Sequence, residues 1–351
     1  MCEVIFEDKE RNLVIRRSST LSPAFLEVLE RTVWGSAGVQ YTMEDMAGVL
    51  KRIKEPHFLS ITENGDLVAV STLIRKTTRL AGKNYHGFYS YALAVVPPKR
   101  GHGYGALLAK QALRYGLNNL GEKGIFYGYV EADNTPSLKA IEKAGRISIG
   151  QYHILVISRF CPRDDARLKI TEETEGEKLF LLLSEQYADH ALTDFKQSIN
   201  TEDYFTLRQG SEILAGMQME RRHLNLKFLP GLSGLIMVKV LPLIPFLWRL
   251  IPGGNYHFLT FGNIYAKEGR EGEIFRLMEA LLARHQLHFG MVYLDKRSPV
   301  YQRIAAAGEF GVFNFLLDVP VHVMVHFKGF SKSEIADIRR QPLFISMMDP
   351  V

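Results

Sequence analysis

A basic, glycine-rich turn is the stretch whose residue types and spacing point most directly to chemistry. Residues 94–113 read AVVPPKRGHGYGALLAKQAL: an apolar run, two prolines, the turn and a helix-period pattern. Gly101, Gly103 and Gly105 let the backbone adopt positive φ and bring successive amide N–H groups close to a ligand. The following helix points its N-terminus at the turn. This arrangement predicts a site for phosphate oxygens.

The elements on either side of the turn must position it. Residues 88–96, FYSYALAVV, are rich in aromatic and β-branched residues and predict a strand with Tyr89, Tyr91, Leu93 and Val95 on one face. Two prolines end this strand, because neither can donate a hydrogen bond to a ladder. A helix is expected over residues 106–117. Without a ligand, the same turn would be only a tight connection.

The spacing of the turn separates it from other nucleotide-binding loops. It lacks the GK[ST] of a P-loop and does not fit GxGxxG, whereas Arg100, Gly103 and Gly105 give RxxGxG. After a strand ending in ValPro, this resembles the acetyl-coenzyme A (acetyl-CoA) binding motif of the GCN5-related N-acetyltransferases. A second segment similar to that family, IFYGYVEADNTPSLKAIEKAG, follows at residues 125–145.

The resemblance implies how a cofactor would be held. The two strands would splay apart, with the pantetheine arm pairing with the first strand and the pyrophosphate on the amides of the turn. The donor implied is acetyl-CoA or a close relative, and no metal is expected. The cofactor-binding residues implied are Leu93, Ala94, Val95, Arg100, Gly101, His102, Gly103, Tyr104, Gly105, Asn134 and Ser137.

Catalytic groups depart from the family pattern. Tyr89 stands where many members have a glutamate base, and Ile141 stands where they have a tyrosine that protonates the thiolate. Glu131 is the nearest carboxylate in sequence to the expected cleft and is the candidate base, although a solvated strand end is the alternative. Tyr129, Tyr127 or water would then replace the missing donor, since strand alternation places both tyrosines on the face of Glu131.

Composition bounds the remaining possibilities. The 351 residues allow two domains, and 46% hydrophobic with 23% charged residues is an ordinary globular balance. A net charge of +5, without a basic stretch, argues against nucleic acid as a partner. Cys2 and Cys161 have no disulfide or zinc spacing. The acidic N-terminus is unlike a signal peptide, so a cytoplasmic location is expected.

The rest of the N-terminal half follows the acetyltransferase order. Residues 13–17 predict a strand, Ser22 a helix cap before Pro23, and residues 22–34 and 43–53 two helices. The turn ENGD predicts a hairpin between two further strands. By resemblance, the connection over residues 35–41 lines the acceptor site; a solvated loop is the alternative.

The second half resembles a degenerate copy of the first. SPVYQRIAAAG at residues 298–308 parallels TPSLKAIEKAG at residues 135–145, and a strand, a helix and a strand precede it. In place of RxxGxG stands KEGREGE, whose acids would repel a pyrophosphate, and Arg297 stands in place of Asn134. We therefore predict an α/β fold, a mixed sheet flanked by helices, with acetyltransferase-like domains at residues 1–160 and 169–340.

One segment, Leu235 to Ile251, is almost continuously apolar. Charges and two prolines make it a poor membrane span. It could be core, a dimer contact or hydrophobic acceptor wall, or an interfacial membrane anchor.

The sequence thus predicts an N-acetyltransferase that moves an acetyl group from acetyl-CoA directly to an amine on a small molecule or peptide. No cysteine near the motifs could carry the acyl group. The alternatives are a non-catalytic CoA-binding, sensing or interaction module and an acyltransferase with a hydrophobic acceptor. A homodimer is compatible with these residues.

Overall fold

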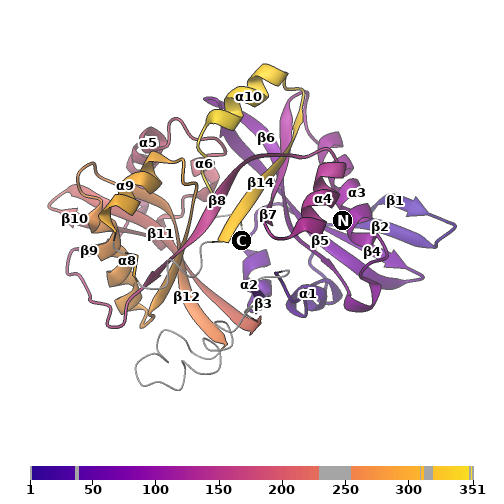
Figure 1. The fold of residues 1–351 in the computed structure, drawn as a ribbon, viewed down its shortest axis with the longest axis horizontal. Coiled ribbons are helices and arrows are strands. Elements are labelled where there is room, and N and C mark those ends of the chain that lie inside the picture. The colour runs from indigo at the N-terminus through magenta and orange to yellow at the C-terminus, as the bar shows by residue number, and fades with distance from the viewer. Residues whose placement is uncertain are drawn as a thin grey trace.

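A mixed β-sheet runs through both halves of the molecule (Figure 1). The computed structural model describes residues 2–35, 39–228, 254–308, 310–311, 319–347 and 349. The apolar segment from Leu235 to Ile251 therefore lies outside the described residues. The strands of the N-terminal half are β1 (Cys2–Asp8), β2 (Leu13–Ser18), β3 (Gln40–Met43), β4 (Pro56–Glu63), β5 (Asp66–Leu80), β6 (Lys83–Val95), β7 (Gly124–Glu131) and β8 (Ile147–Ser158). Those of the C-terminal half are β9 (Leu168–Ile170), β10 (Tyr204–Gln209), β11 (Glu212–Phe228), β12 (Asn255–Ala266), β13 (Phe289–Leu294) and β14 (Val319–Lys328).

Helices cover the sheet in each half. The N-terminal half has α1 (Pro23–Glu30), α2 (Met46–Lys51), α3 (Tyr104–Asn118) and α4 (Thr135–Lys143). The C-terminal half has α5 (Gly176–Gln186), α6 (Phe195–Ser198), α8 (Gly272–Arg284), α9 (Pro299–Ala307) and α10 (Lys332–Arg340). In the N-terminal half α3 packs in one apolar cluster with Phe88 and Phe126, whereas α1 and α2 pack in another with Tyr89 and Tyr127. None of the helices in the described ranges has the length and hydrophobicity that a membrane crossing requires.

The halves exchange strands at the centre of the sheet. Along the described sheet the order is β1-β2-β4-β5-β6-β7-β14-β8-β13-β12-β11-β10-β9. β14, from the C-terminal half, lies between β7 and β8 and pairs antiparallel with both. β8, from the N-terminal half, continues the sheet into β13. Neither half therefore has a complete sheet without a strand of the other.

Side chains cap two helices, one of them at the predicted residue Ser22. The Ser22 side chain accepts a hydrogen bond from Phe25 N at the start of α1, and the Asn134 side chain accepts one from Ser137 N at the start of α4. α3 begins after Gly103, whose φ of 83° lies in the left-handed region. The expected helix from Ser22 to Trp34 is too long, because α1 ends at Glu30.

The connection after α1 contains a strand that the sequence did not predict. The last residues of the connection, together with Met43 from the expected second helix, form this strand, β3. It pairs antiparallel with β11 of the other half. Tyr41 pairs with Leu226, and its backbone also exchanges hydrogen bonds with Trp34. Of this connection, Gln40 and Tyr41 thus pair with the other half, while residues 36–38 lie outside the described ranges.

A bulge in β6 overturns the predicted side-chain alternation. Ala92 has φ of 52°, and the pairing of β6 with β5 shifts register there. Tyr89 and Tyr91 consequently face the cluster of α1 and α2, whereas Leu93 and Val95 face α3. The expectation that all four side chains share one face is wrong, because the extra residue reverses the phase of the strand.

The parallel pairing of β6 and β7 ends just before this bulge. It extends from Gly87 with Ile125 to Ser90 with Gly128, and the later residues of each strand diverge. The C-terminal half repeats the arrangement. β12 pairs in parallel with β13 from Leu259 to Phe261, and Asn263 in β12 has φ of 48° next to a register shift. The chain is thus a tandem of two related α/β units.

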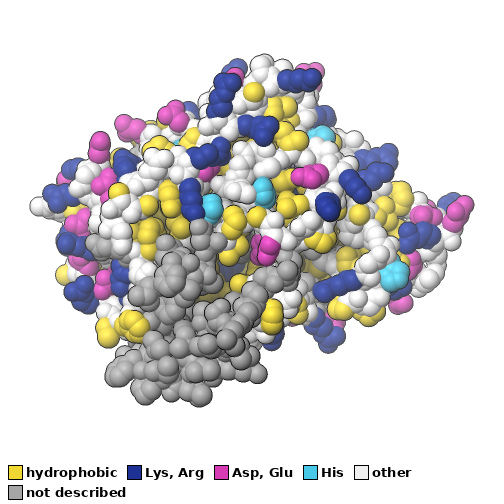
Figure 2. Space-filling model, viewed as in Figure 1, with side chains coloured by type: hydrophobic (Ala, Val, Ile, Leu, Met, Phe, Trp, Pro, Cys, Tyr) yellow, Lys and Arg dark blue, Asp and Glu magenta, His cyan; other side chains and the backbone are white. Residues whose placement is uncertain are grey.

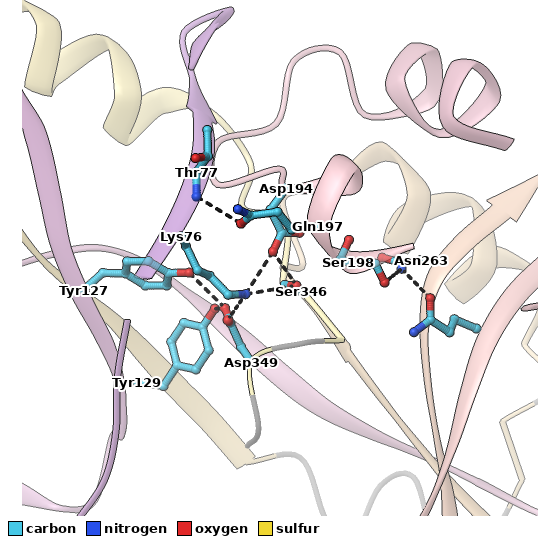
Figure 3. A network of polar contacts seen from close by, with 11 residues as sticks. Lys76, Thr77, Tyr127, Tyr129, Asp194, Gln197, Ser198, Asn263, Ser346 and Asp349 are labelled. Atoms are coloured by element: carbon cyan, nitrogen blue, oxygen red, sulfur yellow. Dashed lines mark hydrogen bonds and ion pairs between the residues drawn. The ribbon is translucent and has the colours of Figure 1, made fainter. Parts of the chain in front are cut away.

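A buried polar network joins three distant segments (Figure 3). Lys76 of β5 donates to Asp194, before α6, at 2.9 Å and forms an ion pair with Asp349 near the C-terminus. Ser346 donates to Asp194 at 2.7 Å. Burial alone would lower the pKa of Lys76, but the two carboxylates hold that pKa above its usual value.

Replacing Lys76 by Met should strongly destabilise the protein, because two carboxylates would stay buried without their cation. We expect a loss of about 3–5 kcal/mol in the free energy of unfolding, measured by denaturant titration. Lys123→Met is the control, since Lys123 is partly exposed, paired with Glu334 and placed over the Phe330 ring, and its effect should be far smaller. Equal losses in the two variants would contradict this account of the network.

Candidate active site

The divergence of β6 and β7 opens a groove of about 770 Å³ on the side of α3 and α4. Its walls are the ends of both strands, the glycine-rich turn and the first turns of both helices. Of the cofactor-binding residues expected from the sequence, those that line it are Leu93, Ala94, Val95, Arg100, Gly101, Gly103, Gly105, Asn134 and Ser137.

The turn has the geometry of an anion site. Gly101 has φ of 82° and Gly103 φ of 83°, and a Cβ atom added to either would meet nothing within 4 Å. Open space beside two left-handed glycines leaves room for a ligand next to the backbone at the N-terminus of α3. The Arg100 guanidinium donates to the Val95 carbonyl oxygen at 3.2 Å, which ties the turn to the end of β6.

Two of the expected cofactor residues lie outside the groove lining. His102 is exposed, and its Nδ1 lies 3.0 Å from the Arg100 carbonyl oxygen. Tyr104 is buried, and its hydroxyl donates to Glu63 at 2.5 Å. Both side chains therefore contribute to the shape of the turn in this structure.

A second cavity, of about 370 Å³, lies beyond the divergence on the side of α1 and α2. Aromatic and aliphatic side chains dominate its wall, among them Tyr91, Tyr152, Phe258 and Met291. Strands β3 and β11 contribute Tyr41 and Leu224, so the bridge between the halves helps to enclose it. The residues that line both the groove and this cavity are Trp34, Tyr41, Ser90, Ala92, Tyr129 and Glu131.

Glu131 stands where the two spaces meet, at the end of β7. It is partly buried, and burial, with a smaller contribution from the charge of Asp133, raises the pKa of its carboxyl group to about 7. A carboxylate with such a pKa can accept a proton near neutral pH and release it again. Glu131 is the expected catalytic residue whose pKa lies near neutrality.

Tyr129 also faces both spaces and is backed by the polar network. Its hydroxyl donates to Asp349 Oδ2 at 2.5 Å, and Tyr127 donates to the same oxygen at 3.3 Å (Figure 3). Burial and the negative charge of Asp349 raise the pKa of Tyr129 well above 10, so this hydroxyl keeps its proton. Tyr89 lines only the second cavity, where its ring lies 5.1 Å from that of Tyr129.

Sequence reasoning missed Asp349, Lys76 and Asp194. Asp349 is more than 200 residues from Tyr129 along the chain, and none of the three belongs to a motif. Their proximity depends on the placement of β14 and the segment after α10, for which the sequence carries no local signal.

The corresponding cleft of the C-terminal half is filled. The Gln186 side chain donates to the Ile264 carbonyl oxygen at 2.6 Å and accepts from Ala266 N at 2.9 Å. It therefore takes up the backbone hydrogen-bonding groups of β12 that lie beyond the bulge. Phe344 and neighbouring residues of the C-terminal segment line the remaining space, which is only about 10 Å³. Glu273 is paired with Arg167 at 2.8 Å. The C-terminal copy thus differs from the N-terminal one mainly because its cleft is filled, and less because its acidic residues would repel a pyrophosphate.

One open copy and one filled copy share a sheet, so the chain is a tandem of two α/β units. In sequence, residues 26–145 match the model of the acetyltransferase (GNAT) family. This segment of the chain is therefore similar to that family, as the resemblance of its motifs predicted. No curated protein matches the chain significantly.

Two solved N-myristoyltransferase structures share the fold of this chain. A crystal structure of Saccharomyces cerevisiae N-myristoyltransferase with bound myristoyl-CoA is similar at a TM-score of 0.58 and 10% identity, covering 92% of this chain and 85% of that one. Another, with bound myristoyl-CoA, has a TM-score of 0.59 and 9% identity, covering 95% and 85%. A GCN5-related N-acetyltransferase from Sphaerobacter thermophilus has a TM-score of 0.46 and 10% identity, covering 77% and 80%. The family match over residues 26–145 and the fold shared with the two N-myristoyltransferase structures support an acyltransferase that uses a CoA thioester.

Glu substitution at Gly103 should abolish CoA binding, because the side chain would place a negative charge at the phosphate turn. Calorimetry with acetyl-CoA should give a measurable affinity for the wild type and none for Gly103→Glu. Gly82→Glu is the matched control: Gly82 has φ of 79° and equally open surroundings but lies in the hairpin between β5 and β6. Equal loss of binding in both variants would show that strain in the backbone, and not the charge at the turn, causes the effect of Gly103→Glu.

Proposed function

We propose that this protein is an N-acyltransferase that moves the acyl group of acetyl-CoA, or a close relative, directly to an amine. The observation that carries the proposal is the position of Glu131, which faces both the groove and the apolar cavity with a pKa of about 7. A base at that junction can reach an amine in one space and a thioester in the other.

The groove accounts for the donor. Beyond Ser90 the edge of β6 is no longer paired with β7, which leaves room for the amide groups of a pantetheine arm along residues 93–95. The glycine turn lies at the end of this path, where backbone N–H groups and the N-terminus of α3 favour a pyrophosphate. Asn134 and Ser137 line the opposite wall.

The chemistry needs two proton movements. Glu131 takes a proton from the acceptor ammonium group, and the neutral nitrogen attacks the thioester carbonyl carbon. As the carbon–sulfur bond breaks, Tyr129 gives its proton to the thiolate and takes up the second proton of the nitrogen, and the proton held by Glu131 leaves to solvent. Tyr129, protonated and close to the same junction, is the donor we assign to the thiolate. The products are an amide and free CoA.

A direct transfer agrees with where the thiols lie. Cys2 and Cys161 are exposed, and neither lines the groove or the cavity. The wall of the apolar cavity favours an acceptor amine with an aromatic or aliphatic body, on a small molecule or a peptide. Acidic and basic side chains are interspersed on the face in Figure 2, so that face has no basic stripe of the kind that nucleic acid requires.

Replacing Glu131 by Gln should lower kcat by at least about 100-fold with little effect on acetyl-CoA affinity, because the base is lost but the groove is not. In the wild type, kcat/KM should rise with pH through about 7 as Glu131 loses its proton, and this limb should vanish in the variant. Steady-state kinetics across pH, with acceptors drawn from a panel of amines, measure both effects.

Asp133→Asn is the matched variant. Since the charge of Asp133 raises the pKa of Glu131, its removal should shift the limb to lower pH and leave kcat on the plateau unchanged. Turnover that survives Glu131→Gln would refute the role of Glu131. Acetyl-CoA binding without turnover of any amine would favour a CoA-binding module instead.

A long-chain acyltransferase is the second candidate, favoured by the apolar character of the cavity that adjoins the groove. The N-myristoyltransferase structures, which hold myristoyl-CoA, have the same fold. In that case the cavity would hold the acyl chain and not the acceptor.

Thermal shift measurements separate the two candidates. Both thioesters are compared at the same concentration, chosen below that at which palmitoyl-CoA forms micelles. If the cavity holds the acceptor, acetyl-CoA and palmitoyl-CoA should then raise Tm by similar amounts. A markedly larger shift with palmitoyl-CoA would favour the long-chain alternative. Phe258→Asp, which places a charge in the cavity wall, should then abolish the excess.

A further inference from the structure

Arg146 is a buried cation in the wall of the donor groove. It follows α4 and precedes β8, and only 3% of its surface is exposed. Its guanidinium carbon lies 4.5 Å from the centre of the Phe126 ring, and the residue lines the groove.

The guanidinium has no anionic partner within the described ranges. Its Nε atom is buried and makes no hydrogen bond there, and burial lowers the pKa of the side chain to about 10. Lys76, the other deeply buried cation discussed above, pairs with two carboxylates. A buried charge without a partner is costly, so Arg146 is poised for an anion that arrives with a ligand.

The depth of Arg146 indicates which end of a donor it meets. A Cβ atom added to Gly128 would lie 3.6 Å from Arg146 Nη1 and 3.1 Å from the Ser90 carbonyl oxygen. Arg146 is therefore level with the last paired residues of β6 and β7. The glycine turn follows Val95, five residues further along β6, or about 16 Å at about 3.3 Å per residue. With the phosphates at the turn, the thioester end of the arm would lie nearer Arg146.

We propose that Arg146 binds a carboxylate at the end of the donor's acyl group, so that the enzyme prefers a short dicarboxylic acyl-CoA to acetyl-CoA. This inference rests on the proposed function, because it takes the groove to be the CoA site. The planar guanidinium can hold a carboxylate through two parallel hydrogen bonds. An acetyl group would leave that charge unpaired.

Calorimetry with acetyl-CoA and succinyl-CoA tests the assignment without requiring turnover. The wild type should bind succinyl-CoA at least about tenfold more tightly, and Arg146→Met should bind both alike. Arg146→Lys keeps the charge but not the planar fork and should retain part of the preference. It also keeps the test valid if Arg146→Met fails to fold. Arg100→Met is the control: it alters the turn and should weaken both ligands by the same factor.

Equal affinities of the wild type for the two ligands would overturn the proposal. So would an equal loss for both ligands in Arg146→Met that disappears with 3′-dephospho-CoA thioesters, because Arg146 would then contact a CoA phosphate. Failure of both thioesters to bind the wild type would refute the proposed function together with this inference. A succinyl preference that depends on Arg146 would stand even if Glu131→Gln left turnover unchanged.

Discussion

The parting of β6 from β7 is the constraint on which the rest of the structure depends. Two parallel strands that stayed paired to their ends would close the sheet and leave no space for a ligand. The bulge at Ala92 prevents this by reversing the phase of β6, so that Leu93 and Val95 face α3 and Tyr91 faces the apolar cavity. One extra residue in a strand thus creates a groove on one face and gives it access to a cavity on the other.

The two units show opposite uses of that geometry. Asn263 repeats the bulge in β12, but Gln186 and the segment around Phe344 occupy the resulting cleft. The same C-terminal segment continues to Asp349, which stands behind Tyr129 of the open unit. A single stretch of chain therefore closes one copy and supports the site of the other. This is a physical reason for the second copy to persist without a groove of its own.

Local chemistry in the sequence predicted much of the open unit. The glycine turn, the cap at Ser22 and, apart from β1 and β3, the strand–helix order all depend on neighbouring residues, and they have the expected form. The bulge at Ala92 was missed because nothing in the alternation of side chains marks an inserted residue. The β3 pairing with β11 and the network around Lys76 were missed because both depend on contacts between distant segments. Arg146 drew no attention in the sequence, since only its burial in the folded chain makes its charge unusual.

The placement of β14 has a consequence for biogenesis. As the chain leaves the ribosome, residues 1–160 emerge first with a β7 edge that has no neighbour, and β8 cannot take its final place beside a strand not yet made. The edge is paired only after residue 328 has been synthesised. During synthesis β7 of the N-terminal half is therefore an unpaired edge strand, which can mispair with other chains. Completion of the sheet around β7 is in this sense a late event of translation.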